Sequence, residues 1–291
     1  ASPVVEPPAI QDLDPAATKT VVVNDPLLLE PTLDAAPVLA AFLERKDGTE
    51  VLAEATGLSL QRIKLTMQKG AVWLTREGST RRLRRAKRTM LPGDTLHIYY
   101  NQEILDTSPP EPELVADEGG YSVWDKPYGM RSQGSKWGDH TTLYRWAERN
   151  LEPERPAFIV HRLDRAATGL MLVAHSKGVA SAFSGMFRSR DMHKKYSVVV
   201  HWQYPTKPTV LDADLDGRSA LSSAYRVNYS QTRDRSLLEV TTETGRKHQV
   251  RRHLAGSGFP VVGDRLYGKP DDGEDLQLVA SHLAFSCPVS E

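Results

Sequence analysis

The sequence predicts an α+β fold, with a mixed, largely antiparallel sheet in its larger part and a small α+β domain before it. The first observation is length, because 291 residues make about two domains of roughly 150 residues each. The second is the order of patterns beyond residue 121, where short apolar runs follow one another without a helix between every pair. A doubly wound sheet would need that regular alternation, so an α+β sheet is expected instead.

The elements of the larger part are predicted from the spacing of its apolar residues. Alternating or continuously apolar runs are typical of strands, whereas apolar residues three and four apart are typical of helices. Strands are predicted at 121–125, 158–161, 169–174, 195–201 and 237–242, and helices at 142–150, 177–190 and 247–256. On this basis we assign 121–291 to one domain.

The small domain is predicted to span residues 36–101. Its elements are a helix at 36–45, a helix that begins after Ser59 and ends at Gly70, a strand at 71–74, a turn at Pro92-Gly93-Asp94 and a strand at 95–100. Serine caps helix N-termini and glycine ends helices. Residues 1–35 are expected to be a disordered or surface-lying tail, and 102–120 an acidic linker.

A net charge of zero conceals a segregation of charge along the chain. Lys and Arg total 37, and so do Asp and Glu. Residues 60–90 hold 10 basic residues against 1 acidic, whereas residues 91–120 hold no basic residue and 7 acidic ones. One concentrated basic block in a neutral chain indicates a localised anionic partner, although a solvated run of charges would give the same pattern.

Composition excludes several classes of protein. The single cysteine, Cys287, allows no intramolecular disulfide and no cysteine-based zinc site, which favours a reducing, cytoplasmic setting. The first 15 residues lack the basic and apolar segments of a signal peptide, and no apolar run approaches the ~20 residues of a membrane span. Glycine-rich dinucleotide and P-loop signatures are missing. We therefore expect no cofactor, no metal and no membrane.

The segment His161-Arg162-Leu163-Asp164-Arg165 places an acid between two arginines at the end of a predicted strand. Neighbouring arginines favour the charged form of a carboxyl group, and a carboxylate in a basic cleft suits a ligand that carries phosphates. A surface network of ion pairs would use the same residues. Tyr196, which opens a later strand, taken alone favours a packed core ring over a platform on which a base stacks.

Cations also gather at 245–254, where a helix is predicted to begin with Arg246 and Lys247. Helix N-termini attract anions, and His248 and Arg251 lie three residues apart, which places them on one helical face. A solvated basic helix is the alternative. In the turn at 263–268, Asp264 is predicted to bond to the backbone rather than to act in catalysis.

The order of these segments resembles the RluA-type pseudouridine synthases over about residues 121–286. The matching motifs are Asp125-Lys126-Pro127 with Gly129, His161 to Asp164, Lys194-Lys195-Tyr196, Gly245 with His248-Gln249-Val250-Arg251, and Gly263-Asp264 with Tyr267-Gly268. This resemblance implies an isomerase that converts uridine in RNA to pseudouridine. One departure is Ala166-Ala167-Thr168, since the family usually carries polar side chains there.

The resemblance also implies roles for particular residues. Asp164 takes the place of the catalytic aspartate, Tyr196 of the tyrosine that stacks on the target base, and Arg251 of the aspartate's basic partner. Arg162 takes the place of a side chain that enters the RNA near the flipped nucleotide. Arg165, Arg246 and His248 are expected to contact RNA.

The small domain resembles the αL RNA-binding motif of ribosomal proteins and RNA-modifying enzymes. Lys69-Gly70-Ala71-Val72 and Gly93-Asp94 match that motif, whereas Trp73-Leu74-Thr75 stands where Asn-Gly is usual. A basic loop beside a helix with exposed cations can follow phosphates without distinguishing the bases. The residues expected to contact RNA here are Arg62, Lys69, Arg81, Arg82, Arg84 and Arg85.

The leading hypothesis is a cytoplasmic, monomeric RNA pseudouridine synthase that acts on structured RNA after base flipping. Ribosomal RNA is favoured over transfer RNA, because αL domains more often accompany work on ribosomal RNA. One alternative is a catalytically silent RNA-binding or ribosome-assembly factor on the same fold, suggested by Ala166 and Ala167. A second is an enzyme for free nucleosides, which the basic block at 81–88 disfavours.

Overall fold

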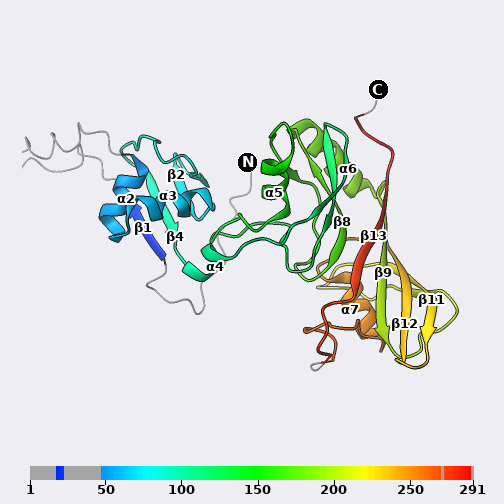
Figure 1. The fold of residues 1–291 in the computed structure, drawn as a ribbon. Helices are drawn as coiled ribbons and strands as arrows, with labels where there is room; N and C mark the ends of the chain where they lie inside the picture. The colour runs from blue at the N-terminus through cyan, green and yellow to red at the C-terminus, as the bar shows by residue number, and fades with distance from the viewer. Residues whose placement is uncertain (1–17, 23–46, 270–271, 290–291) are drawn as a thin grey trace, which may run out of the picture. The chain divides into compact units, whose positions relative to one another are not determined.

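The structure is a computed structural model that describes residues 18–22, 47–269 and 272–289. It divides into two compact units (Figure 1). The N-terminal unit comprises the described residues up to 108 together with 134–140, and the C-terminal unit comprises 109–133 and the described residues from 141 onward. The chain therefore leaves the C-terminal unit at 134 and returns to it at 141.

The N-terminal unit is a four-stranded antiparallel sheet with helices. Its strands lie in the order β1 (Thr18–Val22), β4 (Thr95–Tyr99), β2 (Val72–Arg76) and β3 (Ser79–Arg82). Its helices are α2 (Gly48–Thr56), α3 (Leu60–Gln68) and α4 (Gln102–Asp106). The predicted helix at 36–45 and most of the predicted tail at 1–35 lie outside the described residues.

Local sequence explains where these elements begin and turn. The Ser59 side chain accepts the backbone N–H of Arg62 at 3.3 Å, which confirms the predicted N-cap of α3. Helix α2, which was not predicted, begins with a capping box between Asp47 and Glu50. Between β2 and β3, Glu77 and Gly78 both have positive φ, as a tight hairpin turn requires. Apolar residues of α2, α3 and the sheet form the core of this unit.

The C-terminal unit is built on a nine-stranded sheet. Its main path runs in the order β10 (Thr209–Leu211), β11 (Ser222–Ser230), β12 (Arg235–Thr242), β9 (His193–His201), β13 (Leu278–Ala284), β8 (Thr168–Ala174), β6 (Tyr121–Lys126) and β5 (Glu113–Asp117), and β7 (Phe158–Ile159) pairs with β8. Among these pairs only β13 and β8 run parallel. The mixed, largely antiparallel sheet is therefore confirmed.

Three helices of this unit also confirm predicted ones. They are α5 (Leu143–Asn150), α6 (Lys177–Ser189) and α7 (Gln249–Gly256). Several predicted boundaries differ from the observed ones by one or two residues, and two of them flank motif residues. The strand predicted at 158–161 ends at Ile159, and α7 begins two residues later than predicted because His248 adopts a left-handed conformation, φ 53°. The expectation that His248 and Arg251 share a helical face was therefore wrong.

Strand β13 joins the two halves of the sheet by pairing with β8 on one side and β9 on the other. The backbones of β8 and β13 approach closely at Gly169, whose φ is 103°. A Cβ atom there would lie 2.4 Å from the carbonyl oxygen of Ala280, so only glycine fits this contact.

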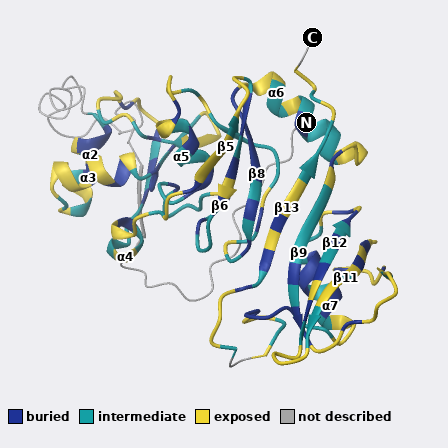
Figure 2. Ribbon diagram, turned by 45° about the vertical axis from the view of Figure 1, so that its right-hand side comes forward, coloured by how far each residue is buried: buried dark blue, intermediate teal, exposed yellow. Residues whose placement is uncertain are grey.

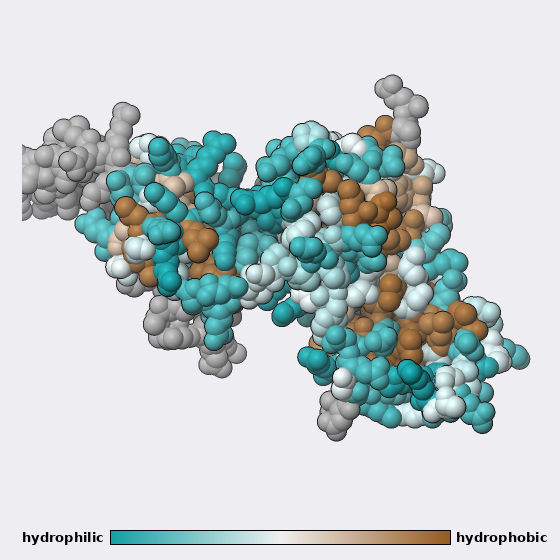
Figure 3. All heavy atoms as spheres, in the orientation of Figure 1, coloured by the Kyte–Doolittle hydropathy of each residue, from teal (hydrophilic) through white to brown (hydrophobic). Residues whose placement is uncertain are grey.

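The two faces of the half-sheet β11-β12-β9-β13 differ. On one face, Val198, Val240 and Ala280 pack with Leu254 of α7 in the main core, and Figure 2 shows α7 as largely buried. Apolar side chains on the same strands remain exposed elsewhere, and Figure 3 shows hydrophobic atoms over this region. These exposed residues are Tyr225, Val227, Leu237 and Val279. Among the described residues, no helix is long and apolar enough to cross a membrane.

Candidate active site

The loop between β7 and β8 carries Asp164, and the segment after β6 holds this loop in place. The Ser132 hydroxyl donates to the carbonyl oxygen of Leu163 at 2.7 Å and accepts its N–H at 3.0 Å. The Gly129 N–H donates to the carbonyl oxygen of Arg165 at 2.9 Å. The residues on either side of Asp164 are therefore fixed by hydrogen bonds to an adjacent loop.

Lys126 lies beneath the same loop and is fully buried. Its ammonium group donates to the carbonyl oxygens of Met130 at 2.9 Å and Pro127 at 3.1 Å. Burial lowers the pKa of Lys126 to about 8, against the opposing effect of the nearby Asp164 and Asp125 carboxylates. This residue supports the loop from inside the protein.

His161, the first residue of the "HRLD" motif, is part of the fold. Its Nε2 accepts the backbone N–H of Leu172 at 2.9 Å, and its ring stacks on Phe187 with 4.8 Å between centroids. Burial, aided by the Lys194 charge, lowers the pKa of His161 to about 3. The imidazole is therefore neutral at physiological pH, as an acceptor must be.

Asp164 and Arg251 face each other as an ion pair. Nη1 of Arg251 lies 3.1 Å from Oδ2 of Asp164. The Asp164 side chain is 22% exposed and that of Arg251 is 7% exposed. The carboxylate thus reaches solvent while its cation lies inside the protein.

A second carboxylate, that of Asp264, holds the other edge of the Arg251 guanidinium. Its oxygens accept Nε at 2.8 Å and Nη2 at 2.6 Å, and the Asp264 side chain is 0% exposed. Asp264 also accepts the backbone N–H groups of Leu266 and Tyr267 at 2.9 and 3.1 Å. The predicted backbone bonding is confirmed, but the sequence did not indicate the contact with Arg251.

His248 completes the surroundings of Asp164. Its Nε2 lies 3.6 Å from Oδ1 of Asp164, and its Nδ1 lies 3.0 Å from the Tyr267 hydroxyl. The adjacent Gln249 shapes this turn, because its side-chain oxygen accepts the backbone N–H of Arg246 at 2.9 Å. Burial lowers the pKa of His248, with Asp164 opposing and Arg251 reinforcing that shift.

A cavity of about 670 Å³ opens beside Asp164, within the roughly 300–1,000 Å³ typical of small-molecule sites. Tyr196 lines it from β9. Burial raises the pKa of Tyr196, with a hydrogen bond to Thr242 acting in the opposite direction. The six predicted site residues that line this cavity are Arg162, Asp164, Tyr196, Arg246, His248 and Arg251.

A second cavity, of about 550 Å³, shares Arg162, Asp164, His248 and Arg251 with the first. Arg165 borders this second cavity, and its Nε donates to the carbonyl oxygen of Gly129 at 3.1 Å. The Asp164 carboxylate therefore faces two spaces, both lined by cations.

Three cations that line the first cavity were not among the predicted site residues. Arg188 and Arg190 come from the end of α6, and Lys194 comes from the start of β9. Burial lowers the pKa of Lys194, with Glu243 opposing. None of the three has a distinctive spacing from the other motifs, although Lys194 precedes Tyr196 in the "KxY" segment.

The departure at Ala166 and Ala167 concerns packing. Ala167 is 3% exposed within the main core, and the half-buried Ala166 packs against it. Two apolar methyl groups thus support the loop that follows Asp164.

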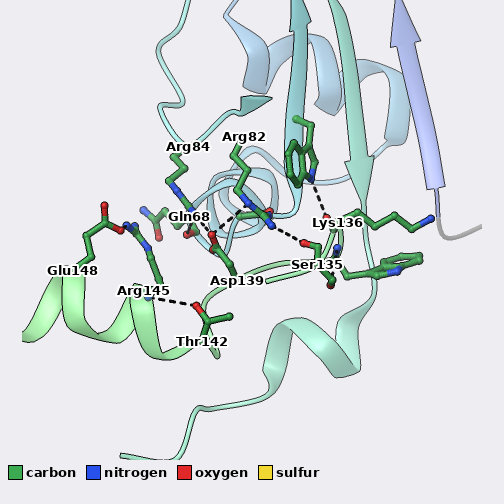
Figure 4. Close-up of polar contacts among 12 residues, drawn as sticks. Gln68, Arg82, Arg84, Ser135, Lys136, Asp139, Thr142, Arg145 and Glu148 are labelled. Atoms are coloured by element: carbon green, nitrogen blue, oxygen red, sulfur yellow. Dashed lines mark hydrogen bonds and ion pairs between the residues drawn. The ribbon is translucent and has the colours of Figure 1, made fainter. Parts of the chain in front are cut away.

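Several arginines of the N-terminal unit contact groups of the same unit. Figure 4 shows Arg82 and Arg84 directed at the carboxylate of Asp139, which is 0% exposed. Nε of Arg82 lies 3.3 Å from that carboxylate, and its guanidinium lies 4.2 Å from the centre of the Trp73 ring. Arg81 and Arg85, by contrast, are exposed.

The helical cations expected to bind RNA also have partners within the N-terminal unit. Arg62 donates to the Tyr100 hydroxyl at 2.7 Å and to Gln102 at 2.9 Å. The Lys69 ammonium donates to the carbonyl oxygen of Leu105. The basic block therefore includes both exposed cations and cations that bond inside the unit.

Comparison with known proteins gives consistent matches. The family described as RNA pseudouridylate synthase matches residues 120–256. The chain is 30% identical to ribosomal large subunit pseudouridine synthase D of Xanthomonas campestris, over 69% of this chain and 67% of that protein. It is also 30% identical to tRNA pseudouridine synthase C of Vibrio cholerae, over 62% of this chain and 87% of that protein.

Solved structures share the fold. Human RNA pseudouridylate synthase domain containing 1 superposes with a TM-score of 0.54 at 19% identity, over 63% of this chain and 83% of that one. Human RNA pseudouridylate synthase domain containing 4 gives a TM-score of 0.50 at 22% identity, over 60% of this chain and 84% of that one. The α+β architecture of the C-terminal unit is thus that of known structures.

Proposed function

Because this chain belongs to the RluA family of RNA pseudouridine synthases, we propose that it isomerises specific uridines in structured RNA, with Asp164 as the essential carboxylate. The observation that carries this proposal is the placement of Asp164, which is partly exposed between two cation-lined cavities and bonded to Arg251. An anionic substrate is drawn to such a site, and the Arg251 guanidinium, 3.1 Å away, fixes the orientation of the carboxylate.

The reaction exchanges one bond for another. The bond between ribose C1′ and uracil N1 breaks, the base turns, and a bond forms between C1′ and C5. The C5 proton leaves and N1 gains one, so no oxidant or reductant is consumed. Asp164 could begin by attacking the ribose, by adding to the ring or by removing a sugar proton. In each case the detached base must be retained and water excluded.

The target uridine must leave its stack before it can reach Asp164, at a cost of a few kcal/mol. We propose that Tyr196 offsets part of this free-energy cost by stacking on the base, an interaction that stabilises by about 1–3 kcal/mol. Arg162, which is exposed and borders both cavities, is positioned to enter the space that the base leaves. Arg165 and Arg246 would contact nearby phosphates or sugars, and His248 lies close enough to Asp164 to contact the ribose of the target nucleotide.

The N-terminal unit is proposed to hold the RNA in the manner of an αL domain. Its exposed Arg81 and Arg85 are suited to phosphate contacts. Ribosomal RNA is the favoured substrate because αL domains more often accompany enzymes that modify ribosomal RNA. Among the relatives, one is named for ribosomal RNA and another for transfer RNA. We also propose a monomer, and a cytoplasmic setting, because a single cysteine suits a reducing compartment.

The test uses unmodified ribosomal and transfer RNA transcripts carrying tritium at uridine C5. The wild-type protein is expected to release tritium, mostly from ribosomal RNA, and Asp164→Asn is expected to bind the same RNA without release. Asp212→Asn, at an exposed aspartate, serves as the matched control and should release tritium normally.

Each outcome decides between the candidates. Tritium release by Asp164→Asn at the wild-type rate would refute the role of Asp164. RNA binding without release from either RNA pool would favour a catalytically silent RNA-binding factor. Release mainly from transfer RNA would overturn the ribosomal preference while leaving the activity intact.

A further inference from the structure

The turn Gly263-Asp264-Arg265-Leu266-Tyr267-Gly268, here called the 263–268 turn, reaches Asp164 by two separate routes. One route runs through Asp264 and Arg251, and the other through Tyr267 and His248. They end on different oxygens of the same carboxylate, Oδ2 for the first and Oδ1 for the second.

The first route fixes a cation. Asp264 takes two nitrogens of Arg251 in a bidentate pair, at 2.8 and 2.6 Å, and leaves Nη1 for Asp164 at 3.1 Å. A planar guanidinium held along one edge presents its remaining nitrogen in a fixed direction. Because Asp264 is buried, its pair with Arg251 lies out of contact with solvent, and it does not depend on Asp164.

The second route fixes an imidazole. The Tyr267 hydroxyl lies 3.0 Å from Nδ1 of His248, and Nε2 lies 3.6 Å from Asp164. The last distance is too long for a hydrogen bond, so the side chains are poised and a small movement would complete the contact. The Tyr267 ring also lies 5.2 Å from the guanidinium carbon of Arg251, which ties the two routes together.

The backbone of the turn is as constrained as its side chains. Gly263 has a φ of 75°, and a Cβ atom there would lie 2.2 Å from the carbonyl oxygen of Asp275. No other residue fits this position without displacing the backbone. The turn is therefore a rigid support for Asp264 and Tyr267.

We propose that Asp264 and Tyr267 are positioning residues that clamp the two oxygens of the catalytic Asp164 through Arg251 and His248. This inference rests on the proposed function, because it explains how the carboxylate of that function is oriented. In this proposal the Tyr267 hydroxyl is the donor to Nδ1, which assigns the proton of the neutral imidazole to Nε2, the nitrogen nearer to Asp164. His248 thereby becomes a directed donor rather than a contact for RNA phosphates.

The charges around His248 support a neutral ring. Burial lowers its pKa, the Arg251 and Lys247 cations act in the same direction, and the Asp164 and Asp264 carboxylates oppose them. A hydroxyl that donates to Nδ1 also favours the neutral form. Removal of that hydroxyl should therefore raise the pKa of His248.

The decisive variant is Tyr267→Phe, which keeps the ring beside Arg251 and removes only the hydroxyl. At saturating RNA we expect the single-turnover rate of pseudouridine formation to fall about tenfold, with the Kd for RNA unchanged. The acid limb of the pH–rate profile should move to higher pH. The matched control is Tyr225→Phe, at an exposed tyrosine of β11, which should leave both measurements unchanged.

Two further measurements keep the inference falsifiable. Nitrogen-15 NMR of histidine-labelled protein should show His248 with its proton on Nε2, and Tyr267→Phe should abolish that preference even if no RNA is turned over. His248→Gln, which can still donate toward Asp164, should retain more activity than His248→Ala.

The outcomes separate the inference from the proposed function. If the wild-type protein makes no pseudouridine, the proposed function fails, and the NMR result alone decides whether the second route exists. If the wild-type protein is active but Tyr267→Phe matches it in rate and pH profile, the clamp is refuted. A weaker Kd with an unchanged saturated rate would also refute it, because that would mean an RNA contact.

Discussion

Each unit holds arginines around a buried carboxylate, and the two clusters differ in what they leave available. In the N-terminal unit, Arg82 and Arg84 both close on Asp139. In the C-terminal unit, Arg251 pairs with one buried carboxylate and also reaches Asp164, which is partly exposed beside a cavity. In the first cluster the carboxylate is fully buried, whereas the second presents a partly exposed carboxylate to a cavity. A basic stretch of sequence therefore predicts positive charge, but the partners of each cation in the fold decide whether it stabilises the protein or is available to a ligand.

The largest expected effect comes from removing the cation of the C-terminal cluster. Arg251→Ala leaves Asp264 buried without its counter-ion, which should lower the free energy of unfolding by about 3–5 kcal/mol. Urea unfolding measures this loss. The neighbouring Arg252→Ala is the control, because its partner Asp216 is 67% exposed and exposed pairs contribute little to stability. Equal losses in the two variants would contradict the structural role of Asp264.

The next effect tests whether Arg82 and Arg84 serve the fold. Replacing both by alanine should destabilise the N-terminal unit by about 3 kcal/mol, because Asp139 stays buried without its two cations. Hydrogen exchange of amides in α3 and β2 would report this loss locally. A variant pair with normal exchange but weakened RNA binding would show that these arginines serve RNA instead.

Arg81 and Arg85 should show the opposite behaviour. Replacing both by alanine should weaken RNA binding about tenfold, and the slope of log K against log salt should fall by about 1.4–1.8 in magnitude, since each of the two phosphate contacts contributes about 0.7–0.9. Unfolding should change by no more than about 0.5 kcal/mol. An unaltered salt dependence would contradict the proposal that Arg81 and Arg85 contact RNA phosphates.

The smallest expected effect is on stability at neutral pH, and it concerns His161, a motif residue whose contacts stabilise the fold. Its pKa falls from 6.5 to about 3 through burial, so between these values the unfolded chain binds a proton that the folded chain excludes. Stability should therefore decline as pH drops below about 6.5. In His161→Gln this decline should be smaller, measured by urea unfolding from pH 4 to 7. His193→Gln, at an exposed histidine, should follow the wild-type curve.

The sequence predicted the strands that carry its motifs, because β6, β8, β9 and β12 contain apolar runs that periodicity detects. It missed β11, whose exposed face interrupts the pattern with Tyr225 and Val227. Strand β13 was missed for another reason. It pairs with β8 and β9, which lie far from it in sequence, and local patterns do not report distant pairing.

The candidate site was predictable where motifs carried it and not where distant residues complete it. The family resemblance predicted site roles for Asp164, Tyr196 and Arg251, and these three residues line one cavity. Cations such as Arg188 belong to no motif and meet that cavity only through the fold. The partnership of Arg84 with Asp139 joins residues 55 positions apart, and the charge pattern of the basic block gave no indication of it.

The central claim is that Asp164 performs the chemistry while the exposed cations of the N-terminal unit hold the RNA. The most direct measurement is single-turnover pseudouridine formation over a range of RNA concentrations, for Asp164→Asn and for Arg81→Ala with Arg85→Ala. We predict that Asp164→Asn binds RNA with the wild-type Kd and forms no product, while the arginine variant reaches the wild-type rate at higher RNA concentration. Product formed by Asp164→Asn at saturating RNA would contradict the account.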